Sequence, residues 1–513
     1  MKTSLLILGS ILVQFSVFGQ QKVWDLGTLG AKGDGLSNNT TLIQGAIDQA
    51  SAAGGGIVRI PAGRYLTSVL RLKSGVELHF DEGAVLLGST LRSDYGGARA
   101  SALLLADDQQ NISLSGKGVI DGQGREVVKD VYRMLEAGTL QDPDWKTENP
   151  WHQKRPNEFN RPGLIQFNRC KGVILRGVTL KDAACWVQTY SDCTDVLFDS
   201  IRVESTAYWN NDGFDIVDCQ NVQVRNCFVN AGDDGICLKS HRADAHCENV
   251  VIDNCTVRSS ASAIKFGTAS LGGFKNVVVS NIKVYDTYRS AIALESVDGG
   301  TLENITVQHI EAKNTGNAIF IRLGHRKKNA GIGRVSHILI SDVRAEVPAG
   351  KPDKGYEMEG PEILTPHNIF PSSITGLPGY PVQDVTLENI ELIYPGGGNK
   401  GTAYVGLDSL GSVPEKESDY PEFSMFGELP SWGFYVRHAA GIKFKNVTMR
   451  YGQDDFRPAV VVDDVQGLAL ENVKIPTAQT APVVVLKGVT GFTKEGGKLP
   501  FSDKKAIRVW GAL

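Results

Sequence analysis

Apolar and polar residues alternate in short phrases that return along this chain every 20 to 30 residues. The phrases are clearest between Arg161 and His325, where they read GFDIV, GICLK, AIKFG, AIALE and AIFIR. A period of two is typical of a β-strand with one buried face. Repeats of this length, built from short strands, predict an all-β fold: a right-handed parallel β-helix, or solenoid, in which each repeat is one turn.

Seven phrases align on a column of small residues: Gly163, Ala184, Gly213, Gly235, Ala263, Ala291 and Ala318. The second and fourth positions of each phrase are mostly apolar, so we expect them to face the core. The third and fifth positions then face outward. They carry a set of charged and aromatic residues on neighbouring turns: Trp186, Asp215, Lys239, Lys265, Glu295 and Arg322.

Other columns have a structural explanation. Cys170, Cys193, Cys219 and Cys247 open matching phrases, and Phe274 takes their place in the next one. A position that accepts Cys or Phe is an apolar stacking site, which predicts buried, reduced thiols rather than a disulfide framework. Asparagine tolerates left-handed turns and forms hydrogen-bonded stacks, so we interpret the following residues as ladders that stabilise the turns: Asn221, Asn249, Asn276 and Asn304.

The ends and interruptions of the repeat define the remaining organisation. Residues 40–52 carry apolar side chains at helical spacing, which predicts a short helix within an N-terminal cap at about 23–60. Three segments break the pattern and are expected to be long loop insertions: 125–161, 345–380 and 395–432. Because no linker composition appears, residues 20–513 are expected to form a single catalytic domain.

The first 19 residues predict a cleavable signal peptide. Lys2 precedes an apolar run that extends to Phe18 and ends in small or polar residues. No later run reaches the roughly 18 apolar residues of a membrane span, so we expect a secreted or periplasmic protein without membrane insertion. A net charge of -4 gives no basic field for nucleic acid. The expected partner is a polysaccharide or oligosaccharide, bound by a monomer.

Four carboxylates concentrate in one stretch, at Asp212, Asp215, Asp233 and Asp234. A single Asp-Gly pair usually marks a turn. Like charges stacked on adjacent turns repel one another, however, and need a functional reason. Paired carboxylates perform acid and base chemistry on glycosidic bonds, and the neighbouring Trp186 offers a face for a sugar ring.

These motifs resemble glycoside hydrolase family 28, the polygalacturonase family. The resemblance rests on GKGVIDGQG, on Asn210-Asn211-Asp212-Gly213 and on Gly232-Asp233-Asp234, and it extends over nearly the whole chain from GAKGDG onward. It implies hydrolysis with inversion, Asp233 as general acid, and Asp212 and Asp234 as activators of water. Inversion requires carboxyls about 6.5–9.5 Å apart. No metal or cofactor is implied.

Two departures bear on the substrate. The family's Gly-His-Gly aligns with Ala261-Ser262-Ala263, and its carboxylate-binding Arg-Ile-Lys aligns with Ala293-Leu294-Glu295. Either cations on neighbouring turns replace the missing ones, or the sugar held there is neutral or differently linked. The expected substrate-binding residues are Asn210, Lys239, Ser262, Lys265, Glu295, Arg322 and Trp186.

Other functions remain open at this point. The four aspartates could instead hold Ca²⁺ in a polysaccharide lyase on the same fold, or the solenoid could bind carbohydrate without turnover. His241 and His246 follow the acidic motif and are expected to be polar surface residues rather than catalysts. If the insertions close one end of a cleft, exo action on a pectin-type chain follows.

Overall fold

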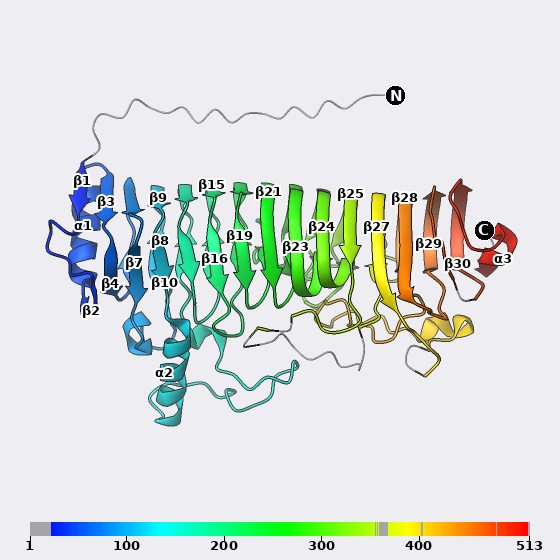
Figure 1. Cartoon of the computed structure of the whole chain (residues 1–513), viewed down its shortest axis with the longest axis horizontal. Coiled ribbons are helices and arrows are strands. Elements are labelled where there is room, and N and C mark those ends of the chain that lie inside the picture. The colour runs from blue at the N-terminus through cyan, green and yellow to red at the C-terminus, as the bar shows by residue number, and fades with distance from the viewer. Residues whose placement is uncertain are drawn as a thin grey trace.

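The chain folds into one elongated solenoid (Figure 1). The computed structural model describes residues 22–510 apart from 354, 357, 359–367, 402–403 and 479. The predicted signal peptide, 1–19, lies outside the described residues. The described strands join in one continuous hydrogen-bonded sheet, and successive turns pair in parallel. The fold is the right-handed parallel β-helix that the repeating phrases predicted.

Each turn of the solenoid contributes one strand to each of three ladders. One turn consists of β17 (Phe214–Val217), β18 (Gln220–Arg225) and β19 (Phe228–Ala231). β17 pairs in register with β20 (Ile236–Ser240), the strand one turn further along. Residues about one repeat apart in sequence therefore become neighbours in space.

The ladders extend from one end of the solenoid to the other, and the longest strands pass through two or three of them. The first ladder continues through β5 (Leu70–Arg71), β8 (Leu104–Asp107), β11 (Ile165–Asn168), β14 (Gln188–Ser191), β22 (Ile264–Ser270), β26 (Ser372–Thr375) and β31 (Ile507–Trp510). The second includes β1 (Val23–Asp25), β3 (Gly56–Ile60), β6 (Val76–Phe80), β9 (Gln110–Gly116), β12 (Lys171–Arg176) and β15 (Thr194–Asp199). The third includes β2 (Asp34–Asn38), β4 (Gly63–Thr67), β7 (Ala84–Gly88), β10 (Val119–Asp121), β13 (Thr179–Lys181) and β16 (Arg202–Ser205). The long strands are β21 (Cys247–Ser259), β23 (Gly273–Ser296), β24 (Thr301–Leu323), β25 (Arg334–Glu346), β27 (Val382–Gly396), β28 (Phe434–Gln453), β29 (Val460–Glu471) and β30 (Val484–Glu495).

Helices cover the two ends. The predicted helix is present as α1 (Thr40–Ala52), and its apolar side chains Ile43 and Ile47 are buried against the first turns. At the other end lies the short α3 (Asp503–Ala506). Figure 1 shows both at the tips of the solenoid, where they cover strand edges that would otherwise be free to pair.

The predicted loop 125–161 is partly wrong, because it begins with a helix. α2 (Gly124–Glu136) buries Val127, Val128, Val131 and Leu135, a helical spacing that lies inside a strongly charged sequence. A short 3-10 helix (Glu158–Asn160) precedes the return to the solenoid. Other 3-10 turns are η1 (Arg92–Tyr95) and η3 (Leu407–Ser412).

The predicted insertion 345–380 also contains part of the solenoid. β26 (Ser372–Thr375) pairs with both β24 and β28 and completes a turn of the first ladder. The polar inward residue Ser372 concealed this strand from the apolar pattern. Its hydroxyl accepts a hydrogen bond from Tyr394 at 2.8 Å, so the polar group is satisfied in the core.

Two phrases were predicted in the wrong register. The alignment placed Ile165 and Trp186 in the outward column of Asp215, whereas the structure places Ile165 beside Gln188, in the inward column of Phe214. Gln188 is fully buried in an inward position, where it accepts a hydrogen bond from Tyr190 and donates one to the carbonyl of Gly213. Trp186 consequently lies in the turn before the strand.

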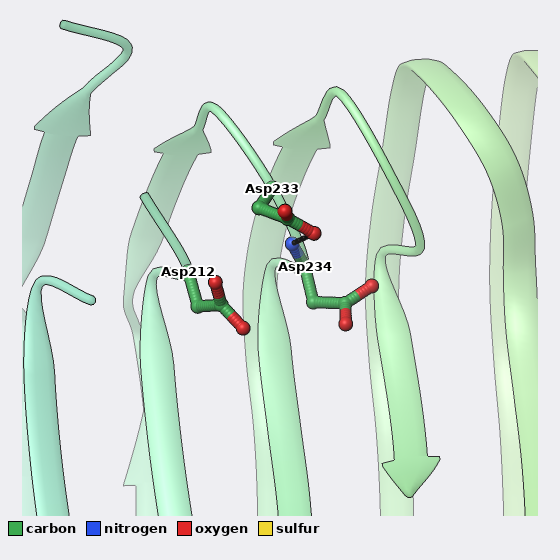
Figure 2. A group of neighbouring side chains, drawn as sticks. All are labelled: Asp212, Asp233 and Asp234. Atoms are coloured by element: carbon green, nitrogen blue, oxygen red, sulfur yellow. Dashed lines mark hydrogen bonds between the residues drawn. The ribbon is translucent and has the colours of Figure 1, made fainter. Parts of the chain in front are cut away.

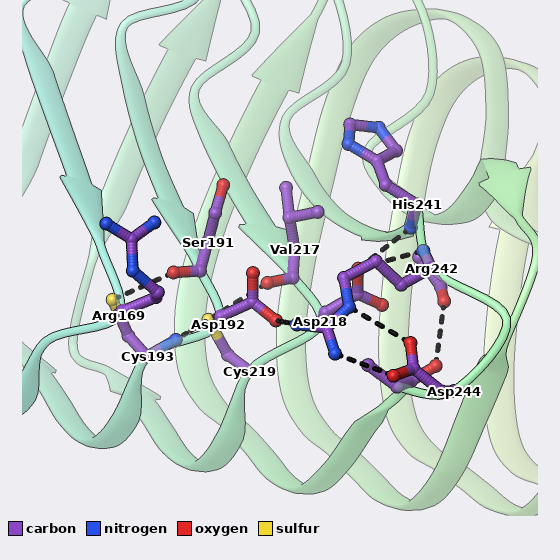
Figure 3. Close-up of polar contacts among 12 residues, drawn as sticks. Arg169, Ser191, Asp192, Cys193, Val217, Asp218, Cys219, His241, Arg242 and Asp244 are labelled. Carbon is purple, nitrogen blue, oxygen red and sulfur yellow. Dashed lines mark hydrogen bonds and ion pairs between the residues drawn. The ribbon is translucent and has the colours of Figure 1, made fainter.

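The cysteine column has the predicted character. All eight cysteines belong to the described residues and are buried without disulfides. The N–H of Cys170 donates to Sγ of Cys193 at 3.4 Å, and the N–H of Cys193 donates to Sγ of Cys219 at 3.3 Å. Asp192 and Asp218, which precede two of these residues, turn the chain with φ of 53° and 51° (Figure 3). The thiols are structural packing groups.

Outward side chains at the centre of the first ladder are buried. Asp215 is 0% exposed, Lys265 and Glu295 are each 1% exposed, and Lys239 is 7% exposed. The insertions lie on one long side of the solenoid (Figure 1) and cover this part of the ladder. A charged network thus lies between the core and the insertions.

Adjacent residues of β21 test the inward and outward assignment. Ile252 is fully buried and Val251 is 42% exposed. We expect Ile252→Ala to lower stability by about 2–5 kcal/mol, because it leaves a cavity in the core. Val251→Ala should stay within about 0.5 kcal/mol of the wild type. Thermal and denaturant melts of both variants measure the difference, and equal losses would contradict the register.

Candidate active site

A pocket of about 280 Å³ opens over the turns that enter β17 and β20. Its floor includes Asp212, Asp233 and Asp234. Trp151, from the insertion 125–161, and Tyr420, from the insertion 395–432, line it from above the solenoid. The pocket therefore combines a rigid ladder with two segments that lie outside the repeat.

Small residues allow the acidic turns to stack. Gly213 follows Asp212 and Gly235 follows Asp234 in the equivalent place of the next turn. A Cβ on Gly213 would come within 2.5 Å of the carbonyl oxygen of Gly235, and a Cβ on Gly235 within 2.4 Å of a methyl group of Val257. Glycine is needed here because of this close approach between turns.

The Asn210-Asn211 pair shapes the first acidic turn. The amide of Asn211 donates to the carbonyls of Ala183 and Cys185, and its oxygen accepts from the backbone, so this buried side chain is structural. Asn210 adopts φ of 59°, and its oxygen accepts a 2.7 Å hydrogen bond from Arg161. Its Nδ2 is thereby directed to Asp233, to which it donates at 3.3 Å.

The three aspartates form a compact cluster. One carboxylate oxygen of each lies within 4.8 Å of the others. Figure 2 shows Asp212 and Asp234 in equivalent places on neighbouring turns, with Asp233 above them. The backbone N–H of Asp234 donates to the Asp233 carboxyl at 2.9 Å. Asp233 is half-buried.

Lys239 is shared by two carboxylates. Its Nζ donates to Oδ2 of Asp212 at 2.9 Å and also contacts Asp215. The same ammonium lies 3.8 Å from the ring centroid of Trp186. Because the side chains of Lys239 and Asp212 are less than a tenth exposed, this interaction is little weakened by solvent. Lys239 therefore fixes the base of the pocket.

Lys265 has a similar role one turn further along. Its Nζ lies 3.1 Å from Oδ2 of Asp234 and donates to the hydroxyl of Tyr420 at 2.9 Å. The backbone N–H of Ser262 donates to the other oxygen of Asp234 at 3.1 Å. Asp234 is thus held by a cation and a backbone dipole, both of which favour its ionised form.

The adjacent carboxyls have pKa values shifted in opposite directions. Burial, together with the charge of Asp234, raises the pKa of Asp233. Burial acts in the same direction on Asp234, but Lys265, Arg289 and Lys239 outweigh it and lower the pKa of that carboxyl. Burial also raises the pKa of Asp212, although Lys239 favours its ionised form. The pKa values of the adjacent carboxyls Asp233 and Asp234 are therefore shifted apart.

Seven of the ten predicted site residues line the pocket: Asp212, Asp233, Asp234, Asn210, Lys239, Lys265 and Trp186. Ser262 lies outside the lining and contributes through its backbone. Glu295 also lies outside it, and burial raises its pKa to about 7. Arg322 is directed elsewhere, since its guanidinium donates to the carbonyls of Gly376 and Glu415.

Sequence reasoning missed several pocket residues. Arg289 and Arg326 come from turns further along the first ladder, while Arg155, Trp151 and Tyr420 come from insertions. A signal for Arg289 existed, because it precedes Ser290 as Asp233 precedes Asp234 in the same column. Residues of the insertions follow no repeat, so no sequence pattern locates them. His241 lines the pocket rim, and His246 does not line it.

The two insertions meet at the pocket. The rings of Trp151 and Tyr420 pack edge to face, with centroids 5.2 Å apart. Tyr420 also binds Lys265, so this contact is anchored to the ladder. Trp186 and Trp209 add further aromatic faces to the lining. Such a pocket offers flat apolar surfaces for sugar rings and polar groups for their hydroxyls.

The aspartate cluster is also the place where a cation could bind. Asp212, Asp233 and Asp234 offer oxygen ligands of the kind that Ca²⁺ takes. Two of these carboxylates already contact the ammonium groups of Lys239 and Lys265. A divalent ion would have to compete with both lysines, so the arrangement fits acid and base chemistry better than metal binding.

Comparisons with known proteins agree with this geometry. The exo-poly-alpha-D-galacturonosidase of Dickeya chrysanthemi is 28% identical over 42% of this chain and 41% of its own length. The endo-polygalacturonase of Pectobacterium parmentieri is 24% identical over 65% of this chain and 84% of its own. The chain thus matches about two fifths of the first relative and most of the second.

A solved structure shares the fold. The family 28 exopolygalacturonase of Yersinia enterocolitica superposes with a TM-score of 0.60 at 18% identity, covering 94% of this chain and 79% of that protein. A β-helix with a carboxylate cluster in an aromatic-lined pocket is the architecture of a carbohydrate-active enzyme. Residues 55–357 match the glycosyl hydrolases family 28, and the chain belongs to that family.

Proposed function

We propose that this chain is an exported, exo-acting glycosidase that cleaves galacturonic-acid-containing, pectin-type polysaccharides or oligosaccharides with inversion. The observation that carries the proposal is the pair of opposite pKa shifts at Asp233 and Asp234 inside a family 28 pocket. Hydrolysis needs a protonated group for the leaving oxygen and an ionised group for water, and these neighbours supply both.

Each aspartate has a distinct role in the proposed reaction. Asp233, held by Asn210 and by the N–H of Asp234, donates its proton to the glycosidic oxygen as the bond to the anomeric carbon breaks. Asp234 and Asp212, on neighbouring turns, orient the attacking water, and ionised Asp234 accepts its proton. Lys265 and Lys239 keep these two side chains in place.

Inversion rests on the family pattern. The nearest oxygens of the cluster lie within 4.8 Å, whereas inverting enzymes commonly separate their carboxyls by about 6.5–9.5 Å. Figure 2 shows Asp233 above the Asp212 and Asp234 pair, so the proposed acid and the proposed water-binding carboxyls approach the pocket from different directions. A water between the pair can then attack a sugar whose leaving oxygen faces Asp233.

Exo action is supported by the walls of the pocket and by the relatives. The contact between Trp151 and Tyr420 connects the two insertions over the site, which restricts passage of a long chain. The Dickeya and Yersinia proteins are named as exo-acting, and the Pectobacterium protein as endo-acting. We assign a pectin-type substrate from these names and from the cations that line the pocket.

Location and assembly complete the proposal. The signal peptide at 1–19 directs export, and residues 20–513 act as one catalytic domain and as a monomer. No helix among the described residues is long and apolar enough to cross a membrane. Substrate polysaccharide is the proposed partner.

We predict a specific loss of turnover for Asp233→Asn. Without a protonated carboxyl, kcat should fall by about 10²–10⁴-fold or more, while the melting temperature stays near that of the wild type. Asp244→Asn is the matched control, since Asp244 is 77% exposed and pairs only with Arg242 among the described residues. Near wild-type turnover of Asp233→Asn on polygalacturonate would show that another group is the acid.

We predict a shift of the pH profile for Lys265→Met. Lys265 lowers the pKa of Asp234, so its loss raises that pKa. Activity needs Asp234 ionised and is lost as pH falls through its pKa, so the acidic limb should move to higher pH. The basic limb depends on protonated Asp233. Burial and Asp234 raise the pKa of Asp233 while Arg289 and Lys265 lower it, so this limb should also move to higher pH, but by less, because Lys265 contacts Asp234 directly. Lys265→Arg should restore part of the acidic limb; an unmoved limb would exclude Asp234 as the base.

Product analysis separates the proposal from the alternatives. We expect new reducing ends, release of short products from the start, and no ultraviolet-absorbing unsaturated sugar. Freshly formed ends should show, by NMR, the anomeric configuration opposite to that of the cleaved bond. Activity should survive a chelator. Absorbance that disappears with chelator would indicate a calcium-dependent lyase, and binding without products a non-catalytic protein.

A further inference from the structure

Arg289 is a buried cation with mostly unused hydrogen-bond donors. Its side chain lines the pocket, and the residue is only 6% exposed. Nε is buried without a hydrogen-bond partner among the described residues. The guanidinium's hydrogen bond within this part of the chain goes from Nη1 to the hydroxyl of Tyr420, at 3.5 Å. A buried guanidinium in this state costs free energy that a bound anion would recover.

Apart from Arg289, four Lys and Arg side chains of the described residues line the pocket, and three of them are already neutralised. Lys239 is paired with Asp212, Lys265 is paired with Asp234, and both guanidinium contacts of Arg326 go to Asp298, at 2.9 and 2.7 Å. Arg289 forms no ion pair with a described residue within the same distance limit of 4.0 Å. Burial lowers the pKa of Arg289, but Tyr420, Glu422, Asp233 and Asp234 outweigh it and keep the guanidinium charged, while its buried Nε is left for a ligand.

The position of Arg289 on the ladder suits a ligand that also reaches Asp233. Arg289 and Asp233 occupy the same place in their turns, two turns apart, as the pairing of Ile236 with Ile264 and of Ile264 with Ile292 shows. Adjacent turns are separated by about 4.8 Å, so the two backbones lie roughly 10 Å apart. The turn between them carries Ala261, whose methyl group leaves space in the pocket.

The chemistry of the free donors defines the ligand. A guanidinium presents a planar fork that matches the two oxygens of a carboxylate. The family's carboxylate-binding Arg-Ile-Lys is replaced here by Ala293-Leu294-Glu295, so this cation is not supplied at its usual place. Tyr420 holds the fork in position, because its hydroxyl accepts from both Lys265 and Arg289.

We propose that Arg289 binds the carboxylate of a uronic acid unit next to the scissile bond and sets the preference for acidic over neutral sugars. This inference rests on the proposed function and identifies the residue that selects its substrate class. Binding of this carboxylate also favours the protonated form of Asp233, which the proposed mechanism requires. A protonated Asp233 carries no charge to balance that of Arg289, and the substrate carboxylate balances it instead. Arg289 is thus a specificity-determining residue rather than an acid or base.

The test compares one acidic oligosaccharide with its neutral counterpart. Trigalacturonate and α-1,4-galactotriose, which differ only in the carboxyl, are assayed with the wild type, Arg289→Gln and Arg289→Lys. We expect Arg289→Gln to lower kcat/KM on trigalacturonate by about 10- to 100-fold more than on galactotriose, with each variant assayed at its own pH optimum because Arg289 also lowers the pKa of Asp234. Arg289→Lys should recover part of the loss, since it keeps the charge without the fork.

Two further variants separate this site from general charge effects. Arg242→Gln removes a surface cation that pairs with Asp192 and Asp244, and it should leave kcat/KM on both substrates at the wild-type value. Arg155→Gln removes the other pocket guanidinium that has a buried donor without a partner, Nη1. A loss confined to the acidic substrate in Arg155→Gln and absent in Arg289→Gln would overturn the assignment, as would equal losses on both sugars in Arg289→Gln.

A binding measurement distinguishes failure of this inference from failure of the proposed function. Calorimetric titration of Asp233→Asn with both sugars reports recognition without turnover. If the wild type cleaves no galacturonide but Asp233→Asn binds trigalacturonate, and the added Arg289→Gln change abolishes that binding, the site stands and the activity is wrong. If trigalacturonate is cleaved with no dependence on Arg289, the activity stands and the site is wrong. Absence of both cleavage and binding overturns both.

Discussion

The in-register stacking of turns is the constraint on which this molecule depends. Parallel pairing places each residue of β17 directly beside its counterpart in β20, about 4.8 Å away. Asp212 and Asp234, separated by more than 20 residues in sequence, are neighbours only because of this pairing. The same pairing demands that Gly213 and Gly235 carry no side chain, since a Cβ would meet the next turn. Fold and site are therefore set by one repeated backbone interaction.

The insertions convert an exposed face into a buried one. On a bare solenoid the outward residues of the first ladder would lie in water, where their charges would be screened and their pKa values close to normal. Covered by the insertions, Lys265 is 1% exposed and Asp234 is 3% exposed. Burial strengthens each charge interaction and makes an unpaired charge costly. This is why most buried charges of the pocket have a partner, and why Arg155 and Arg289, each with a buried donor that has no partner among the described residues, are exceptions.

Most of the fold could be predicted from the sequence because its pattern is periodic. The turns, α1 and the cysteine column follow from spacing alone. Three features were hidden where a local rule was broken. Gln188 and Ser372 place polar groups in the core, satisfied by hydrogen bonds from tyrosines, so their strands were shifted or missed. α2 buries one apolar face within a charged segment that reads as a loop.

The site residues that belong to the repeating turns could be predicted from the sequence, and those that belong to the insertions could not. Asp212, Asp234 and Lys265 were found because columns place them on adjacent turns, and the structure brings them to one pocket. Arg322 shares a column with Lys239, but its guanidinium donates to a loop carbonyl. Its orientation is therefore set by the insertion and not by the ladder. Tyr420 is more than 150 residues from Lys265 in sequence, with no pattern connecting them. Only packing of the insertion could place it.

In the proposed mechanism, neighbouring aspartates perform opposite tasks because they have different partners, although both are the same type of residue. Asp233 receives neutral hydrogen bonds from Asn210 and a backbone N–H, while Asp234 contacts an ammonium group. Two carboxylates this close cannot both ionise without cost, so the one with the cation keeps the charge and the other keeps the proton. The division of roles is thus set by Lys265, which lies on the next turn of the same ladder. A site of this kind needs no special strand geometry. It needs only that the turn carrying Lys265 pairs in register with the turns that carry Asp212 and Asp234.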